Sequence, residues 1–125
     1  MKRLNFLFLL LAVSVFSSCK KNQLNGSSII KGKVVHHSKA IAGARVFIKF
    51  DAKEFPGTDT TLYDSKVVAD ANGNFRVACY KGDYYLFGYG HDLAIDPPYV
   101  VVGGVPVSIR KNEEVELQIA VTEGD

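Results

Sequence analysis

The chain has 125 residues, enough for one domain, and its 47% hydrophobic and 22% charged residues are ordinary for a globular protein. Its formal net charge of +2 at pH 7 is too small to favour nucleic acid as a partner. Two cysteines and three histidines exclude a disulfide-built scaffold and most metal centres made of histidine and cysteine.

The first 18 residues have the three parts of an export signal. A basic start, Lys2-Arg3, is followed by an almost wholly apolar run over residues 4–16 and then by two serines. This order is typical of a secretory signal peptide. The run is too short to remain as an anchor, because a membrane-spanning helix needs about 20 apolar residues. We therefore predict that residues 1–18 are a signal peptide.

The segment VFSSC, residues 15–19, resembles the lipobox of bacterial lipoproteins. In that family the cysteine thiol takes a diacylglyceryl group, the signal is cut before the cysteine, and the new amine is acylated, as with palmitate. The resemblance implies that Cys19 is lipidated and that the bilayer is a partner, since two or more acyl chains anchor a protein stably. The residue after the cysteine is Lys20 rather than aspartate. By analogy with the sorting of such lipoproteins, this implies the outer membrane of the cell envelope.

Residues 20–28, KKNQLNGSS, are polar and contain glycine and serine. This composition predicts that residues 19–28 are the lipidated cysteine and a flexible tether. Removal of the signal also removes Lys2 and Arg3, which takes the formal net charge to zero. Neither nucleic acid nor an electrostatic membrane contact is then indicated.

From residue 29 onward the sequence consists of short alternating runs separated by turn residues, which favours an all-β domain over residues 29–122. Asn72-Gly73 predicts a hairpin turn, because both residues tolerate positive φ. About seven strands in a domain of this size are typical of a β-sandwich. The predicted strands cover residues 30–34, 44–50, 63–69, 75–79, 84–89, 99–102 with 105–109, and 115–121.

Three motifs resemble the carboxypeptidase regulatory-like domain. GKV at 32–34 with AGARV at 42–46 is similar to its opening, DANGNF at 70–75 to its D-x-x-G-x-F turn, and GDY at 82–84 to its G-x-Y. The resemblance implies a seven-stranded antiparallel Greek-key β-sandwich of the transthyretin-like (prealbumin-like) type. The family is mostly non-catalytic, so it implies a binding module rather than an enzyme, with no cofactor.

The motif residues are explained by turns. Gly43 lies where the chain turns tightly into a strand, and Gly82 ends a strand. Asp70 can accept hydrogen bonds from turn amides, while Asn72 and Gly73 supply the turn conformation. We predict structural roles for all five and a catalytic role for none.

Metal and catalytic sites are not indicated. His36 and His37 are neighbours, and neighbours on a strand point to opposite faces, so both histidines cannot readily reach one metal ion from a strand. We predict that they lie in an exposed turn before Ala40 and hold no metal. There is no G-x-S-x-G motif, and the chain lacks the Tyr-Arg-Gly-Ser motif of transthyretin-like 5-hydroxyisourate hydrolases. A hydrolase or metal-binding protein would need His91 to meet either histidine, or an acidic residue, in a pocket. Cys79 is predicted to be a buried small hydrophobic residue.

An aromatic stripe is the candidate binding site. By period two, Tyr85, Phe87 and Tyr89 share the outward face of one strand, with Tyr80 beside them. An exposed stripe would suit a glycan, a peptide or an envelope protein. The alternative is that the loop at 51–62 packs over it. The apolar residues of that loop are Phe55 and Leu62.

These patterns predict an envelope lipoprotein that acts as a non-catalytic binding or assembly module. One alternative is a carbohydrate-binding accessory protein of a nutrient-uptake system, which requires the aromatic stripe to be exposed and coplanar. The other alternative is the hydrolase or metal-binding protein described above.

Overall fold

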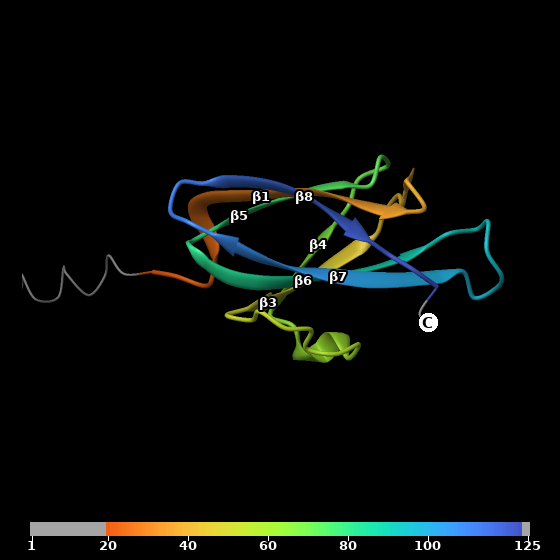
Figure 1. The fold of residues 1–125 in the computed structure, drawn as a ribbon, viewed down its shortest axis with the longest axis horizontal. Coiled ribbons are helices and arrows are strands. Elements are labelled where there is room, and N and C mark those ends of the chain that lie inside the picture. Colours follow the sequence, from red (N-terminus) through yellow and green to blue (C-terminus); the bar gives the residue numbers. More distant parts are fainter. Residues whose placement is uncertain (1–19, 124–125) are drawn as a thin grey trace, which may run out of the picture.

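The computed structural model describes residues 20–123, which form a β-sandwich of two four-stranded sheets (Figure 1). The first sheet has β1 in its middle, with β8 on one side and both β5 and β2 on the other. The second sheet has the order β4-β3-β6-β7. The strands are β1 (Leu24–His36), β2 (Lys39–Ala40), β3 (Arg45–Phe50), β4 (Ser65–Val68), β5 (Asn74–Cys79), β6 (Gly82–His91), β7 (Val100–Ile109) and β8 (Glu114–Ala120), with one 3₁₀ turn, η1 (Thr60–Leu62).

The predicted β-sandwich is confirmed, but the prediction that it has seven strands, all antiparallel, is wrong in two respects. The turn after β1 adds the short strand β2, so the described residues contain eight strands. In addition, β8 runs parallel to β1. The chain leaves β7 in the second sheet and crosses to the first, so β8 does not pair in a hairpin with the strand before it. The first sheet is therefore mixed.

The core lies between the sheets and follows the period-two pattern of the strands. Gly32 is a special position in β1, because a Cβ there would overlap the Phe75 ring, which fills the space beside the missing side chain. The core includes Ile30, Val34, Val46, Ile48, Tyr84, Leu86, Val101 and Ile119.

The hairpin before β5 has the predicted turn chemistry. Asp70 Oδ1 accepts hydrogen bonds from the backbone N–H of Asn72 (2.8 Å) and of Asn74 (3.0 Å). Gly73 has a φ of +75°, and Gly43, at the turn before β3, has a φ of +67°. The backbone is left-handed at both positions, and glycine adopts this conformation without the strain that a side chain would bring. Gly82, the first residue of β6, has a φ of +151°.

Residues 22–28, predicted to be part of a flexible tether, are instead paired with the domain. The Asn22 backbone N–H donates to the Lys81 carbonyl (2.9 Å), and its side-chain oxygen accepts from the Asp83 N–H (2.9 Å). The prediction rested on polar composition, but a polar segment can satisfy its backbone groups at a sheet as well as in water. Only Lys20 and Lys21 precede this docked segment among the described residues.

The start of β1 is fixed by a bulge and a buried hydroxyl. Leu24 and Ser28 both lie opposite Cys79, with the extra residues of the bulge between them. Ser28 is fully buried, and its Oγ donates to the Arg110 carbonyl at 2.6 Å. The segment before residue 29 is therefore an integral part of the first sheet.

The predicted signal peptide, residues 1–18, and Cys19 lie outside the described residues. Within residues 20–123, we find no helix with the length and apolar character needed to cross a membrane.

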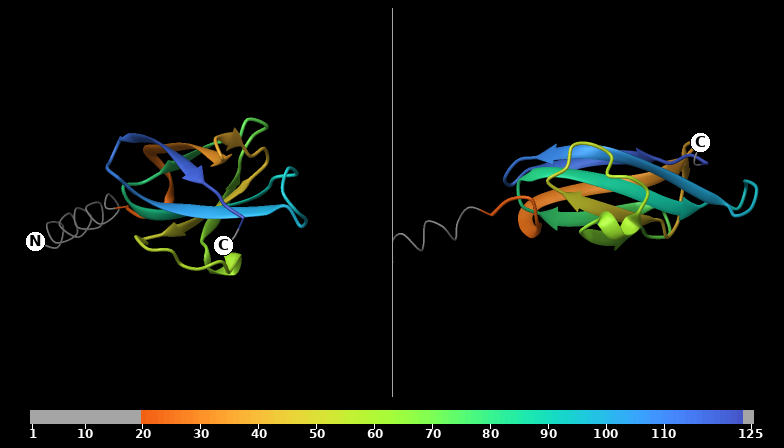
Figure 2. Two further views of the ribbon diagram at one scale, coloured as in Figure 1. Left: turned by 45° about the vertical axis from the view of Figure 1, so that its right-hand side comes forward. Right: turned by 90° about the horizontal axis from the view of Figure 1, so that it is seen from below.

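The two ends of the sandwich carry different parts of the chain. The N-terminal segment joins the domain at one end (Figure 1). The β1–β2 turn, the β6–β7 loop (92–99) and the last described residues gather at the opposite end (Figures 1 and 2). We call these the N-terminal end and the distal end.

Candidate functional site

The aromatic stripe is covered at two of its three positions. Tyr85 and Phe87 are only 8% and 2% exposed. The Phe55 ring lies 5.8 Å from the Tyr85 ring and 5.6 Å from the Phe87 ring, and Tyr63 stacks on Phe87 at 5.7 Å. Of the two interpretations of the stripe, the one in which the loop packs over it therefore holds at Tyr85 and Phe87, because Phe55 and Tyr63 lie against these rings. Figure 1 shows the backbone of this loop on the side of the second sheet that faces away from the first sheet.

Hydrogen bonds within the covering loop, residues 51–63, stabilise its conformation. Asp59 caps η1 by accepting from the Thr61 N–H at 3.0 Å, and the Tyr63 hydroxyl donates to the Gly57 carbonyl at 2.9 Å. Burial, with a smaller effect of Tyr85, raises the pKa of Tyr63 to about 12. Of the two apolar loop residues, Phe55 reaches the stripe, whereas Leu62 is 52% exposed.

Tyr89 and Tyr80 do not restore a platform. Tyr89 is half-buried, and its ring meets the edge of the His91 ring at 5.7 Å. Tyr80 lies near the N-terminal end, where its ring packs under the Lys20 ammonium (5.7 Å) and its backbone N–H donates to Gln23. Binding by these tyrosines stays a prediction, and the carbohydrate-binding alternative loses the exposed coplanar stripe that it required.

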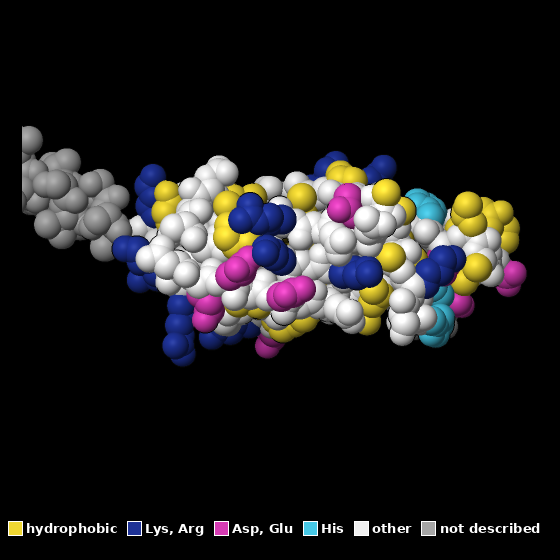
Figure 3. Space-filling model, turned by 90° about the horizontal axis from the view of Figure 1, so that it is seen from above, with side chains coloured by type: hydrophobic (Ala, Val, Ile, Leu, Met, Phe, Trp, Pro, Cys, Tyr) yellow, Lys and Arg dark blue, Asp and Glu magenta, His cyan; other side chains and the backbone are white. Residues whose placement is uncertain are grey.

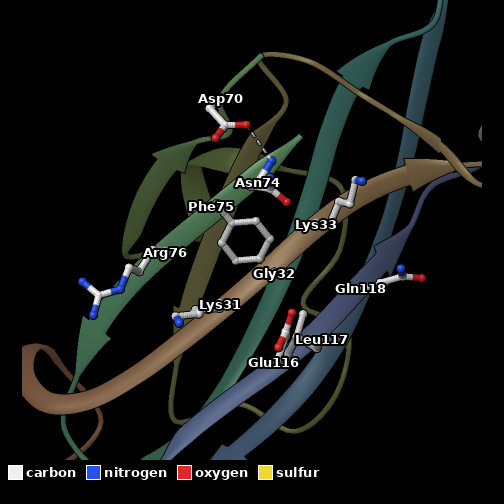
Figure 4. Close-up of a pocket in the computed structure, with 10 residues that line it drawn as sticks. All are labelled: Lys31, Gly32, Lys33, Asp70, Asn74, Phe75, Arg76, Glu116, Leu117 and Gln118. Carbon is white, nitrogen blue, oxygen red and sulfur yellow. Dashed lines mark hydrogen bonds between the residues drawn. The ribbon is translucent and has the colours of Figure 1, made fainter. Parts of the chain in front are cut away.

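The first sheet leaves its outer face open, and a groove with a volume of about 790 Å³ lies on it. Lys31, Lys33 and Arg76 come from β1 and β5, while Glu116 and Gln118 come from β8 (Figure 4). Figure 3 shows the face of the molecule that carries these mixed charges. We call this the outer groove. Sequence reasoning missed it, since alternating polar residues on strands read simply as a solvated face.

The charges of the outer groove are only partly paired. Lys31 Nζ lies 2.6 Å from Glu114 Oε1, and this ion pair lowers the pKa of the Glu114 carboxyl. Within residues 20–123, Lys33 and Arg76 make no ion pair. The groove therefore offers cationic side chains to a partner.

The N-terminal end is rich in cations. A shallow pocket there is lined by Lys21, Lys81, Arg110 and Lys111, together with Asn22 of the docked segment. The acidic residues Asp51, Asp83 and Glu113 also line it, so the basic character is moderate.

The distal end holds a buried ionic group that sequence reasoning did not anticipate. His36 Nδ1 lies 2.7 Å from Asp92 Oδ2, and both side chains are 4% exposed. Lys39 Nζ donates to Asp92 Oδ1 at 2.8 Å, and the Ala94 N–H donates to the same oxygen at 3.0 Å. These contacts, from Lys39 first and then His36, hold the pKa of Asp92 well below its usual range.

The two neighbouring histidines lie together, and the predicted exposed turn before Ala40 contains only the second of them. His36 is the last residue of β1 and is buried. His37 is outside β1 and has a φ of +49°, as part of a two-residue turn with Ser38 (φ +67°). This turn interrupts the alternation of the strand and brings the His36 and His37 ring centroids to 4.2 Å. His91, the expected third partner, packs on Tyr89 instead.

Cys79 is fully buried in the core. Burial raises the pKa of its thiol, which disfavours the reactive thiolate.

The comparisons with known proteins find likeness in structure only. No family model matches this chain, and neither does any curated protein. The major pilin subunit of Bacillus cereus aligns with a TM-score of 0.52 and 17% identity, over 78% of this chain and 30% of the pilin subunit. A candidate carbohydrate-binding protein from Pseudomonas aeruginosa aligns with a TM-score of 0.51 and 14% identity, over 82% of this chain and 93% of that one.

A DUF3823 family protein from Parabacteroides merdae gives a TM-score of 0.43 and 15% identity, over 75% of this chain and 46% of that one. At these identities the likeness to the first two proteins shows a shared β-sandwich fold. The chain spans less than a third of the length of the pilin subunit, with 30% of it covered.

Proposed function

We propose that this chain is an envelope lipoprotein whose sandwich is a non-catalytic binding or assembly module held close to the membrane. The observation that carries the proposal is the short distance between the lipobox cysteine and the docked segment. Two residues, Lys20 and Lys21, separate Cys19 from Asn22, and the three Cα–Cα steps between them span at most about 11 Å. An acylated Cys19 would therefore hold the N-terminal end at the level of the lipid headgroups.

The charge of the N-terminal end supports this arrangement. Lys20 and Lys21 adjoin the proposed lipidation site, and Lys81, Arg110 and Lys111 lie on the same end of the domain, where they outnumber the acidic residues Asp51, Asp83 and Glu113. Each basic residue near an anionic membrane surface contributes about 1 kcal/mol to attraction. The lipid would supply the anchoring and the basic residues would orient the domain, most naturally at the outer membrane, as Lys20 after the cysteine implies.

Metabolic labelling with an alkyne-tagged palmitate tests the anchor. We expect the full chain to be labelled and to stay in the membrane fraction after a high-salt wash, which removes proteins held only by charge. Cys19→Ala should abolish the label and release the domain. The matched control is Cys79→Ala, which removes the other cysteine and should leave both intact. An unlabelled wild-type chain, or a labelled Cys19→Ala variant, would refute the proposal.

The outer groove is the proposed binding face. The second sheet is covered by the loop before β4, whereas the groove leaves polar side chains of the first sheet open. Three basic residues line the groove (Lys31, Lys33 and Arg76) against two acidic ones (Asp70 and Glu116). Lys33 and Arg76 make no ion pair among the described residues, so we assign the groove an anionic surface of another envelope component as its partner. The resemblance to carboxypeptidase regulatory-like modules supports a binding role over catalysis.

Crosslinking and co-purification from native membranes test this face. The wild type should capture a stoichiometric partner, and the double variant Lys33→Glu/Arg76→Glu should lose it. Lys53→Glu/Lys66→Glu makes the same charge change on exposed residues of the covering loop and β4, and should retain the partner. Equal capture by both double variants would exclude the outer groove as the binding face.

A further inference from the structure

We infer that the distal end is a binding site for a divalent transition metal ion of the zinc type, with His36, His37 and Glu123 as ligands. One ligand atom of each residue lies within 4.8 Å of the other two. No other set of three histidine, cysteine or acidic residues within residues 20–123 comes this close. Two imidazoles and a carboxylate are ligands typical of Zn²⁺.

The geometry of His36 is that of an oriented metal ligand. Asp92 accepts the proton of His36 Nδ1 at 2.7 Å, and this contact fixes the tautomer with a lone pair on Nε2. Because Lys39 and the Ala94 N–H hold the Asp92 carboxylate, it orients the histidine rather than reaching the metal. A carboxylate behind a ligating histidine is the usual second layer of a zinc site.

The separation of two of the ligand atoms is close to that of a zinc site. His36 Nε2 lies 3.8 Å from Glu123 Oε1, which is too long for a hydrogen bond. Zinc bonds of about 2.0–2.2 Å in tetrahedral geometry separate two ligand atoms by roughly 3.4 Å. A shift of a few tenths of an ångström would close this pair onto one ion. The separations that involve the His37 ligand atom are at most 4.8 Å, so bringing it to the same ion takes a movement of up to about 1.4 Å. Glu123 and His37 are both exposed, so their side chains have room to move.

The turn after β1 explains why two neighbouring residues can serve one ion. On a regular strand their side chains would diverge. The positive φ of His37 places its ring beside that of His36, with centroids 4.2 Å apart. The fourth position of a tetrahedral site is left to water or to a group from a partner. Figure 3 shows the histidine side chains at the end of the molecule away from the N-terminal segment.

Isothermal titration of the purified full chain with ZnCl₂ tests the site. We expect one equivalent of Zn²⁺ to bind the wild type, and both His37→Asn and Glu123→Gln to weaken binding at least tenfold. Asparagine keeps the positive φ of the turn accessible, so His37→Asn should fold normally. His91→Gln, which removes an exposed histidine outside the cluster, should bind zinc as the wild type does.

Cobalt substitution supplies an independent readout. Co²⁺ in a tetrahedral site of two nitrogens and oxygens should give visible absorption bands that zinc displaces and that both ligand variants lack. The inference is overturned if the wild type takes up no zinc, if His37→Asn binds it equally well, or if His91→Gln loses it. In any of these outcomes the His36–Asp92 pair serves only to hold the distal end together.

Discussion

Several side chains owe their position to a neighbour far along the chain. The Phe75 ring fills the space left by Gly32, and Asp92 closes on His36 across the distal end. Local pattern indicates that Gly32 lies on a strand and that Phe75 faces the core. It carries no information about the pair that they form, because that depends on strand register.

Tyr63 gives a prediction at this scale. The folded phenol keeps its proton to a pKa of about 12, whereas an unfolded tyrosine ionises near 10. The folded state thus binds more protons above pH 10, so the free energy of unfolding should fall as pH rises from 10 to 12. Urea unfolding of the wild type and Tyr63→Phe at pH 7 and pH 11 checks this.

The variant should lose less stability between the two pH values than the wild type. At pH 7 it should be less stable by about 0.5–1.5 kcal/mol, because it lacks the hydrogen bond to Gly57. An identical pH dependence in both proteins would show that Tyr63 titrates as it does in water.

The histidines show where residue-level prediction ends. The sequence places His36 and His37 next to each other, and the rule of alternation separates them. A turn of two residues with positive φ breaks that rule. The sequence predicts a turn before Ala40, and His37 lies in it, but the pattern does not show that His36 stays on the strand and is buried. The sequence also does not indicate that Asp92, rather than the neighbouring His91, is the partner of His36.

Among the elements, the start of β1 differs most from expectation. The cores of the strands follow from alternating apolar residues, and the predicted ranges overlap the observed ones for every strand except β2. The segment 24–28 has no alternating apolar residues. It is part of the sheet because its backbone pairs with β5 through a bulge. Composition predicts solvation of these residues and says nothing about an available sheet edge.

Ser28 tests the docking of this segment. Ser28→Ala removes a buried hydrogen bond and leaves the Arg110 carbonyl without its hydroxyl donor, so it should cost about 1–2 kcal/mol of unfolding free energy. Ser27→Ala, at the exposed neighbouring position, should change stability by less than about 0.5 kcal/mol. Hydrogen exchange should also show protected amides over 24–30. Rapid exchange there would mean that the tether is loose after all.

The covering loop makes a prediction of its own. Phe55→Ala removes the ring that lies over Tyr85 and Phe87, and should cost about 1 kcal/mol because Phe55 is itself half exposed. It should also increase binding of a hydrophobic dye by opening the aromatic face. Leu62→Ala, on the same loop but facing solvent, is the control and should do neither. Equal dye binding by both variants would argue against a cover at Phe55.

On the scale of the whole molecule, the proposed lipid anchor would give the two ends of the sandwich different surroundings. The proposed lipid places the N-terminal end at the membrane, and the histidine cluster then lies at the far end. The outer groove runs along the side between them. A partner in the groove could therefore approach along the membrane, while the distal end remains accessible from the aqueous side.

Cys79 reports on the sandwich as a unit. Its thiol is enclosed by both sheets, so a thiol reagent should reach it only when the domain opens. In a Cys19→Ala background, labelling in native buffer should be at least about 10³-fold slower than in urea, given ordinary domain stability. Fast labelling without denaturant would reveal a core that opens locally.

The pairing of β1 with β8 sets the order in which the domain can be completed. Ile30 in the central strand lies opposite Val115 near the end of the chain, so the first sheet lacks one side until almost the whole polypeptide is available. Contacts between such distant segments form late, because closing long loops is entropically costly. A chain threaded through a membrane from its N-terminus would stay unfolded throughout transit. Its sandwich would close only after the last strand had crossed. The chain would therefore remain in the unfolded state that passage through an export channel requires.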